Sequence, residues 1–323
     1  MRVNGNDIGK AIKTIRKAKN ISRLELSEAV GISKSHIEKI EAGLRCPRMD
    51  TYQKILKFLG SDDIVADAIK EAVNIGYRHF DTAQAYGNER GVGEGIRNCG
   101  IPRDEIFVTS KVAAEHKTYD EVMAGIDETI KKIGLDYLDM MIIHSPQPWE
   151  KVNQSEDRYV NGNREAWKAL EDSYKAGKLK AIGLSNFRIG DIENILEVYE
   201  IKPMVNQILL HISNTPLELV EYCQGKDIIV EAYSPIAHGE ILHQRKIAVI
   251  AEKYGVSVPQ LCIRYTLQLG AVSLPKTGNP EHMRTNAEVD FEISPEDMKM
   301  LKNFKHIKDY GQSSHFPVYG GKM

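Results

Sequence analysis

Two hydrophobic patterns follow one another along the chain. Over residues 7–59 apolar side chains recur every three to four positions; in NDIGKAIKTIRKAKN, Ile8, Ile12 and Ile15 share one helical face, and lysines and arginines occupy the rest. From residue 61 onward, helical segments alternate with short runs rich in β-branched residues. We therefore expect a small all-α domain over residues 1–60 and a larger domain of alternating strands and helices over residues 61–323.

The larger segment contains seven short apolar runs: YRHFD, IFVTSK, LDMMIIH, KAIGLSN, PMVNQ, IIVEAYS and AVSLPK. Strands that alternate with helices pair in parallel, and this repetition predicts an α/β fold, a TIM-type (β/α)₈ barrel. The runs end at Asp81, Lys111, His144, Ser185–Asn186, Gln207, Tyr233–Ser234 and Lys276–Thr277. The carboxyl ends of barrel strands lie at one face, where barrel enzymes carry their active sites. We expect these polar side chains to converge in one mouth.

The charge changes sign at the same boundary. The whole chain has a net charge of −2, but residues 1–60 carry +7 and the remainder carries −9. A small basic module commonly faces a polyanion. No apolar run reaches the length of about 18 residues that a membrane span needs, and the basic N-terminus does not resemble a signal peptide, so we expect a cytoplasmic protein. The four scattered cysteines predict neither a disulfide framework nor a metal site.

The segment ISRLELSEAVGISKSHIEKIEAG has the spacing of two short helices joined by a tight turn. Gly31 supplies the positive φ of the turn, small Ser27 lets the helices cross closely, and Ser33 caps the second helix. The segment resembles the Cro/repressor-type helix-turn-helix family, and LRCPRMDTYQKILKFLG is similar to that family's closing helix. The resemblance implies a DNA-binding domain whose recognition helix spans residues 33–42.

Side chains on the outer face of that helix would enter the major groove, and nearby arginines would contact phosphates. The DNA-binding residues implied by the resemblance are Arg23, Lys34, Ser35, His36, Lys39 and Arg45. Glu38 lies on the same side and would be repelled by DNA unless it accepts a hydrogen bond from a cytosine amino group. A helical protein-interaction module with a solvated basic face remains the alternative.

Several motifs of the larger segment match one enzyme family. They are GYRHFDTAQAYGNE, FVTSKV, LDMMIIHSP, GKLKAIGLSNF, VNQILLH, EAYSP and LPKTGNPEHMRTN, over roughly residues 65–290. In this combination they resemble the aldo-keto reductase family. The resemblance implies an NADPH-dependent oxidoreductase that reduces aldehyde or ketone carbonyls, with a catalytic tetrad of Asp81, Tyr86, Lys111 and His144.

These residue types suit that chemistry. Carbonyl reduction leaves an oxyanion that needs a proton, and a phenol with a pKa of about 10 is a reluctant donor near neutrality. The Lys111 ammonium beside Tyr86 would lower the phenol pKa, and Asp81 would hold the lysine in place. His144 would donate a hydrogen bond to the substrate oxygen. Each residue alone also has a purely structural explanation, such as a helix cap or a satisfied core histidine; the combination favours catalysis.

The resemblance also implies a nicotinamide cofactor. Tyr233 would stack under the nicotinamide ring, whose carboxamide Ser185, Asn186 and Gln207 would bind. The cofactor-binding residues implied overall are Ser185, Asn186, Gln207, Tyr233, Ser234, Lys276, Thr277, Arg284 and Asn286. The cations among them suit the 2′-phosphate of NADPH. His282 stands where NADPH-preferring members commonly have arginine, so we expect weaker discrimination against NADH.

One family feature is missing, because residues 60–63 lead directly from the basic segment into the helix IVADAIKEAVNIG. Family members normally begin with a hairpin and a first barrel strand, so we expect a barrel that lacks this strand. The tail SSHFPVY, a second subunit or the last helix of the basic segment would fill the gap, or it would stay open. The run GVGEG over residues 91–95 lacks the full dinucleotide fingerprint and is predicted to be helix surface.

Two functional hypotheses remain. The first is a carbonyl reductase with a DNA-binding head, whose partners are a small carbonyl compound and DNA. The second is a transcriptional regulator whose barrel senses NADPH or a carbonyl ligand with little turnover. The complete tetrad favours the first hypothesis, and the missing strand favours the second.

The sequence specifies neither the carbonyl substrate nor the DNA target. Trp149, Phe316 and Tyr319 are candidate walls of the substrate pocket, and a surface position is an equal alternative for Trp149. The oligomeric state is open, because helix-turn-helix heads usually bind paired half-sites as homodimers whereas these barrels are often monomers.

Overall fold

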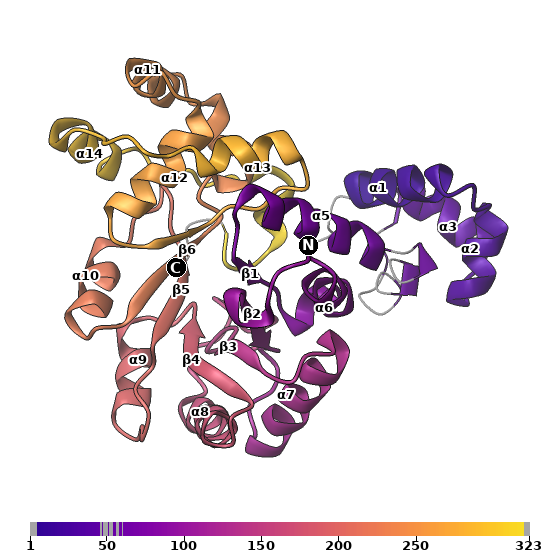
Figure 1. The fold of residues 1–323 in the computed structure, drawn as a ribbon, viewed down its shortest axis with the longest axis horizontal. Helices are drawn as coiled ribbons and strands as arrows, with labels where there is room; N and C mark the ends of the chain where they lie inside the picture. Colours follow the sequence, from indigo (N-terminus) through magenta and orange to yellow (C-terminus); the bar gives the residue numbers. More distant parts are fainter. Residues whose placement is uncertain are drawn as a thin grey trace.

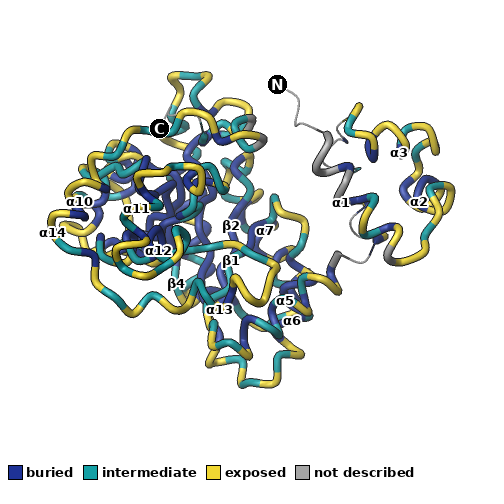
Figure 2. The backbone as a smooth tube through the Cα atoms, turned by 90° about the horizontal axis from the view of Figure 1, so that it is seen from above, coloured by how far each residue is buried: buried dark blue, intermediate teal, exposed yellow. Residues whose placement is uncertain are grey.

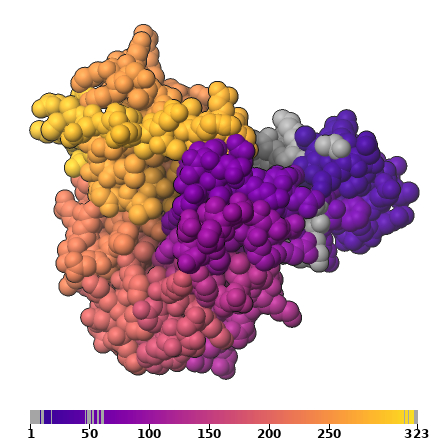
Figure 3. Space-filling model, in the orientation of Figure 1, coloured from indigo at the N-terminus to yellow at the C-terminus, as the bar shows by residue number. Residues whose placement is uncertain are grey.

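A helical head lies at one side of an α/β barrel. The computed structural model describes residues 5–45, 47, 51, 54–55, 58–59 and 61–319. The head comprises α1 (Gly5–Ala18), α2 (Arg23–Val30) and α3 (Lys34–Glu41), and it lies beside the first barrel helices, α5 (Ser61–Ile75) and α6 (Glu89–Arg97) (Figure 1). In the space-filling view the head protrudes from the body of the molecule (Figure 3). Lys19 and Asp63 form an exposed ion pair of 3.1 Å between head and barrel.

All seven predicted strands are present and form one parallel sheet in sequence order, which confirms the predicted barrel type. The strands are β1 (His79–Asp81), β2 (Phe107–Val112), β3 (Leu138–Ile143), β4 (Leu179–Ser185), β5 (Val205–Leu209), β6 (Ile229–Tyr233) and β7 (Val272–Leu274). The remaining helices are α7 (Tyr119–Ile133), α8 (Val160–Lys175), α9 (Ile189–Leu196), α10 (Leu217–Gly225), α11 (Arg245–Lys253), α12 (Val258–Gln268), α13 (Pro280–Ala287) and α14 (Pro295–Lys302). The 3₁₀ segments are η1 (Gln84–Tyr86), η2 (Arg103–Glu105), η3 (Ala237–His243) and η4 (Gly311–His315). No helix of the described residues is long and apolar enough to cross a membrane.

The barrel interior has an apolar side and a polar side. Met140, Ile142 and Val205 form a small buried cluster on β3 and β5, separate from the large core between the strands and the outer helices. Asp81 and Gln207 hydrogen-bond to each other although their strands, β1 and β5, are not neighbours in the sheet. Their contact therefore crosses the interior of the barrel. Figure 2 shows that buried backbone is concentrated inside the barrel.

The predicted absence of the first strand is confirmed, because the sheet ends at β1 and β7 and no other strand of the described residues pairs with these edges. The edges are partly exposed, so water can satisfy their backbone groups and the free-energy penalty is reduced. The helical layer nevertheless bridges the gap: Tyr77 Oη donates to Met283 O (2.8 Å), and Arg284 pairs with Glu71 (3.2 Å). Helices α5 and α13 therefore close the outer layer where the strands do not.

The expected filler segments do not pair with these edges in the described structure. The tail hydrogen-bonds elsewhere: Pro317 O accepts from Asn153 Nδ2 (3.0 Å), and the Tyr319 hydroxyl contacts Ser234 Oγ (3.1 Å). The predicted closing helix of the head, over residues 44–60, lies largely outside the described residues.

The head contains the predicted helix-turn-helix. Ser22 and Glu25 form a capping box at the start of α2, and Ser33 Oγ accepts from His36 N at the start of α3. Gly31 ends α2 with a φ of 72°, the left-handed conformation that the turn requires. Leucine, isoleucine and valine side chains of all three helices form one buried cluster that is separate from the barrel core.

The prediction for residues 91–95 is right about the helix and wrong about its exposure. Gly91, Gly93 and Gly95 of α6 are buried against α5 and the end of α7. A Cβ atom on Gly93 would lie 1.7 Å from Ile133 O, and one on Gly91 would lie 2.7 Å from Asp62 Cα. The glycines therefore permit close packing of backbones, which the helical period alone does not reveal.

Candidate active site

The four predicted catalytic residues meet at the carboxyl ends of the first three strands. Asp81 ends β1, Lys111 lies near the end of β2, His144 follows β3, and Tyr86 closes the turn η1. Lys111 Nζ donates to the Asp81 carboxylate and to Thr82 O (2.9 Å), and it lies 4.9 Å from the centroid of the Tyr86 ring. The rings of Tyr86 and His144 are edge to face, with centroids 5.7 Å apart. The structure thus brings an acid, a cation, a phenol and an imidazole into one group.

Gln84 holds the turn that carries Tyr86. Its Nε2 donates to Gly125 O (2.8 Å) on α7, and its Oε1 accepts from Ala113 N (2.7 Å) just after β2. Because both ends of this amide are bound to the backbone of neighbouring elements, the turn is fixed in position. Gln84 was not among the predicted site residues, because a glutamine in a loop gives no periodic signal.

Lys111 stays charged although it is fully buried. Burial by itself would lower the pKa of Lys111, but the charge and hydrogen bond of Asp81, together with Tyr86, raise it above its ordinary value. A permanent ammonium group therefore lies beside the Tyr86 ring at all physiological pH values.

The pKa of Tyr86 is raised rather than lowered. Solvent reaches 48 % of this residue, yet the surrounding walls of the mouth raise the pKa more than Lys111 lowers it, and Asp81 also raises it. Lys111 acts in the expected direction, but its charge does not outweigh desolvation. Tyr86 is accordingly protonated at neutral pH and able to donate its proton.

His144 is neutral at neutral pH. Burial, and secondarily the charge of Lys111, hold the pKa of His144 well below its ordinary value. Its Nδ1 is buried without a hydrogen-bond partner among the described residues. The Trp149 ring stands edge-on to the imidazole at a centroid distance of 4.9 Å, so this predicted wall residue does border the site. A neutral imidazole has one N–H group with which to bind an oxygen atom.

Five of the predicted cofactor residues lie at the same mouth: Ser185, Asn186, Gln207, Tyr233 and Ser234. Asn186 has a φ of 61° directly after β4; its Nδ2 donates to His144 O (3.0 Å) and to Ser185 Oγ (3.1 Å). Its Oδ1 accepts from the Tyr233 hydroxyl (2.7 Å). The left-handed conformation, which asparagine tolerates better than most residues, lets one side chain link the ends of β3, β4 and β6.

Gln207 has partners that the sequence analysis did not foresee. Its Nε2 donates to Asp81 Oδ1 (2.9 Å) and to Oε2 of the buried Glu231 (2.8 Å). Burial raises the pKa of Glu231 to about 7, and Asp81 adds to the rise. The signal that could have found Glu231 is the two-residue period of IIVEAYS, which places this carboxylate on the same face as Tyr233.

The other predicted cofactor residues form a separate, more exposed group between the end of β7 and the last turn of α13: Lys276, Thr277, Arg284 and Asn286. Lys276 is exposed just after β7, and Thr277 Oγ1 accepts from Asn279 N (3.1 Å). Arg284 is held by Glu71 of α5 across the open edge. Lys276 precedes the start of α13 and Arg284 lies in its last turn, and exposed cations of this kind suit an anionic group.

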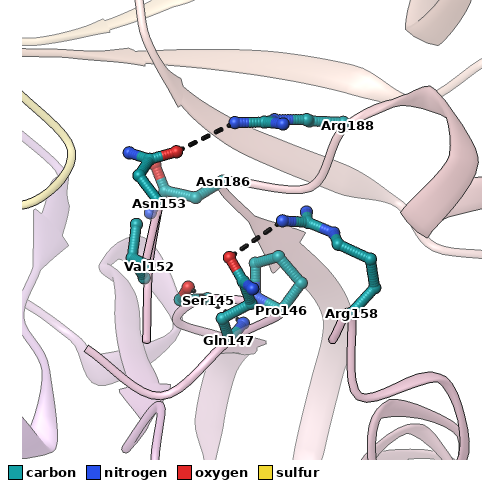
Figure 4. Close-up of a pocket in the computed structure, with 8 residues that line it drawn as sticks. All are labelled: Ser145, Pro146, Gln147, Val152, Asn153, Arg158, Asn186 and Arg188. Carbon is teal, nitrogen blue, oxygen red and sulfur yellow. Dashed lines mark hydrogen bonds between the residues drawn. The ribbon is translucent and has the colours of Figure 1, made fainter. Parts of the chain in front are cut away.

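A small cavity lies beside the mouth, behind Asn186. Its lining residues are Ser145, Pro146, Gln147, Val152, Asn153, Arg158, Asn186 and Arg188 (Figure 4). Arg188 donates to Asn153 Oδ1 (3.1 Å) and Arg158 to Gln147 Oε1 (2.9 Å), so much of its polar lining is internally hydrogen-bonded. With a volume of about 10 Å³ it has room for one water molecule and is not a substrate pocket.

The tail lies over Tyr233. Tyr319 is half-buried, with its ring 6.5 Å from that of Tyr233 and 4.6 Å from that of His238. Phe316 is 48 % exposed, and its ring lies 6.1 Å from Tyr319. Of the two predicted tail residues, Tyr319 therefore contacts a residue of the mouth, and Phe316 packs on Tyr319.

The predicted DNA-contacting residues lie on and around α3. Lys34, Ser35, Lys39 and Arg45 are exposed, whereas His36 is half-buried. Burial, with Arg45 and Lys39, lowers the pKa of His36. Arg23 differs from the rest, because its Nε donates to the buried Glu41 (2.7 Å), which Arg16 also binds. This ion pair gives Arg23 a structural role inside the head.

Comparison with known proteins identifies both parts of the chain. The profile of the aldo/keto reductase family matches residues 60–306, and a helix-turn-helix profile matches residues 12–63. The chain therefore belongs to the aldo/keto reductase family and carries a helix-turn-helix at its N-terminal side.

Individual relatives agree with this assignment. The chain is 42 % identical over 236 residues to glyoxal reductase of Bacillus subtilis, an alignment that covers 73 % of this chain and 81 % of the relative. It is 43 % identical over 242 residues to an uncharacterized oxidoreductase of the same organism, covering 73 % and 82 %. The structure of a Bombyx mori aldo-keto reductase in complex with NADP matches with a TM-score of 0.67 and 31 % identity, covering 80 % and 90 %. These relatives support oxidoreductase activity.

Proposed function

We propose that the protein reduces the carbonyl group of aldehydes or ketones with NADPH. The observation that carries the proposal is the buried Lys111–Asp81 pair beneath Tyr86, with His144 edge-on to the same ring. The B. subtilis relative is named glyoxal reductase, which fits a small carbonyl substrate.

The residues of the mouth fit a nicotinamide ring. Gln207 Oε1 makes no hydrogen bond within the described structure, although both hydrogens of its Nε2 are engaged. Ser185 and Asn186 offer further polar groups beside it, and the Tyr233 ring offers a face for stacking. NADPH would supply the hydride when bound there.

In the proposed reaction, the substrate carbonyl oxygen lies between Tyr86 and His144. His144, neutral at neutral pH, donates a hydrogen bond that orients the carbonyl and shares the charge that develops on oxygen. Tyr86 donates its proton to that oxygen, and the Lys111 ammonium stabilises the resulting phenolate. Asp81 keeps Lys111 charged and in position.

Steady-state oxidation of NADPH and NADH with a panel of aldehydes tests this proposal. We expect turnover by the wild type and a loss of about 10²- to 10⁴-fold in kcat for Tyr86→Phe, because the proton donor is removed. Tyr199→Phe, at an exposed tyrosine after α9, is the matched control and should retain wild-type activity. Absence of turnover by the wild type would remove the enzyme hypothesis, and turnover that is indifferent to Tyr86→Phe would remove the proposed role of Tyr86.

The proposed cofactor preference rests on the group around α13. Lys276 and Arg284 would bind the 2′-phosphate and Asn286 the adenine, with Thr277 beside them. The exposed His282 stands where an arginine would supply a permanent charge, so NADPH should be favoured over NADH by a smaller factor than an arginine would give.

The open edge of the barrel favours a second candidate function, a regulator that binds NADPH or a carbonyl ligand with little turnover. The two candidates differ in one measurement, since a sensor binds NADPH but does not oxidise it at a rate that depends on Tyr86.

We further propose that residues 1–60 form a DNA-binding domain and residues 61–323 a catalytic domain of a cytoplasmic homodimer. The exposed residues Lys34, Ser35 and Lys39 on α3 would enter the major groove, with His36 at its border and Arg45 on the backbone. Because Arg23 Nε is bound to Glu41, only the remaining guanidinium N–H groups of Arg23 would be available to a phosphate.

Reversing two charges tests the head. Lys34→Glu with Lys39→Glu should weaken binding to genomic DNA fragments at least about tenfold at roughly 50 mM salt and flatten the salt dependence, because phosphate contacts are lost. Lys17→Glu with Lys54→Glu, both outside α3, is the control with the same change in net charge. Equal losses in both variants would show attraction by net charge instead of insertion of α3.

A further inference from the structure

The barrel interior beneath the tetrad contains a second carboxylate that the proposed reaction does not use. Glu231 on β6 is only 3 % exposed, and its Oε2 accepts from Gln207 Nε2 at 2.8 Å. The same nitrogen donates to Asp81 Oδ1 at 2.9 Å, and Asp81 in turn holds Lys111. Glu231 therefore connects to the catalytic group through one glutamine side chain.

Two carboxylates determine how the Gln207 amide is oriented. An amide NH₂ group has two hydrogens, and each is donated here to a different carboxylate. If the amide were flipped, Oε1 would take the place of Nε2 and would face the carboxylate oxygens of Asp81 and Glu231. Oxygen atoms that have no hydrogen between them repel one another. Since the amide group is planar, engaging Nε2 on both sides directs Oε1 away from the carboxylates.

Asp81 alone would not fix this orientation. Its carboxylate is already engaged by the Lys111 ammonium, and a single acceptor leaves the amide able to turn about one hydrogen bond. Besides Asp81, Lys111 and His79 are ionisable groups near Glu231. His79 Nε2, on β1, lies 3.9 Å from Glu231 Oε1 and 2.9 Å from Thr109 Oγ1. His79 borders Glu231 but makes no hydrogen bond with the Gln207 side chain in the described structure.

We propose that Glu231 is a positioning residue that holds the carbonyl oxygen of Gln207 toward the cofactor, so that the site selects a nicotinamide carboxamide by its N–H donor. This inference rests on the proposed function. The selected chemical feature is the N–H of an amide substituent at position 3 of the pyridine ring. Gln207 Oε1 would accept a hydrogen bond from this N–H. Glu231 itself touches neither cofactor nor substrate.

The test compares two cofactors that differ only in this group. Isothermal titration calorimetry with the full chain measures the Kd of NADP⁺ and of its 3-acetylpyridine analogue, in which an acetyl group replaces the carboxamide. Because both share the adenosine end, the ratio of the two Kd values cancels every effect outside the nicotinamide site. For the wild type we expect the carboxamide to be favoured by about tenfold, the value of one well-placed hydrogen bond.

Two variants complete the experiment. Glu231→Leu removes the acceptor and should reduce the ratio to about threefold or less, while Glu231→Gln retains an acceptor oxygen for Gln207 Nε2 and should keep the wild-type ratio. A wild-type ratio in a folded Glu231→Leu variant, or loss of the ratio in Glu231→Gln, overturns the positioning role. If the wild type binds neither dinucleotide, the proposed function itself fails, and this outcome is distinct from an unchanged ratio.

Discussion

Lys111 and Glu231 illustrate how individual buried charges behave in this barrel. Both are almost fully buried, yet the pKa of Lys111 rises and the lysine keeps its charge, whereas the pKa of Glu231 rises to about 7 and the carboxylate is half neutralised near neutral pH. The difference lies in the partners: Lys111 faces an opposite charge in Asp81, but Glu231 faces a neutral amide and a like charge. The charge of Lys111 is therefore permanent, and Glu231 is titratable.

This titration predicts how stability changes with pH. Since the pKa of Glu231 is about 7 in the fold and about 4.5 in the unfolded chain, the native state holds the proton more tightly. The contribution of Glu231 is favourable at low pH and is lost as the pH rises from about 4.5 to about 7. Relative to the wild type, Glu231→Gln should gain about 3 kcal/mol in the free energy of unfolding between about pH 4.5 and about pH 8.

Urea unfolding of both chains at the two pH values measures this gain. The titration of nearly all other groups cancels because the two chains share them. A stability difference that stays constant across this pH range would contradict the raised pKa of Glu231.

At the scale of single elements, α6 shows why three alternate glycines occur between the Tyr86 turn and β2. Each glycine faces a neighbouring backbone: Gly91 and Gly95 face α5, and Gly93 faces the end of α7. Glycine in a helix interior lowers helix stability by roughly 1 kcal/mol relative to alanine, so these glycines are tolerated for the close packing they allow. This packing attaches α5, the helix that follows the head, to the segment that carries Tyr86.

Gly93→Ala should therefore destabilise the fold strongly. The new Cβ would lie 1.7 Å from Ile133 O, and backbone cannot yield as a flexible side chain does. We expect a loss of about 3 kcal/mol or more in the free energy of unfolding, measured by urea titration.

The matched control for this substitution is Gly190→Ala. Gly190 is exposed in α9, and no heavy atom lies within 4 Å of the position that an added Cβ would occupy. The control should be neutral or slightly stabilising because alanine favours the helix. Equal effects of the two substitutions would argue against the close approach of α6 and α7.

At the scale of the whole molecule, the outer layer of helices is closed, whereas the inner sheet is open between β1 and β7. Helices α5 and α13 meet across the gap, while the outer edges of β1 and β7 have no partner strand among the described residues. Two residues of the candidate site are away from the open edge, because Lys111 lies on β2 and His144 follows β3, and both strands are paired on both sides. Asp81 lies at the end of the edge strand β1.

Amide hydrogen exchange should reveal the open edge. The amides of β1 and β7 should exchange at least about tenfold faster than those of β3, which is buried and paired on both sides. Exchange followed by mass spectrometry of peptic peptides gives the comparison. Protection of β1 and β7 equal to that of β3 would mean that a second copy or another segment covers the edge in solution.

Much of the architecture was predictable from local patterns. Short runs rich in β-branched residues between helical segments located the seven strands, and the polar residue at each strand end located the mouth with Asp81, Lys111 and His144. Gly31 and Ser33 likewise located the helix-turn-helix, since a turn with positive φ and a helix cap are properties of a few consecutive residues.

The sequence by itself thus determined the order and type of the elements, because periodicity and turn chemistry act over a few residues along the chain. Only the tertiary structure decided which groups became partners: Gln207 binds Asp81, 126 positions away, and Arg23 binds Glu41 inside the head. It also decided that the α6 glycines are buried and that Tyr86 has a raised pKa. Burial and pairing depend on the approach of distant segments, and desolvation in the folded barrel outweighs the charge of a neighbour that the sequence could identify.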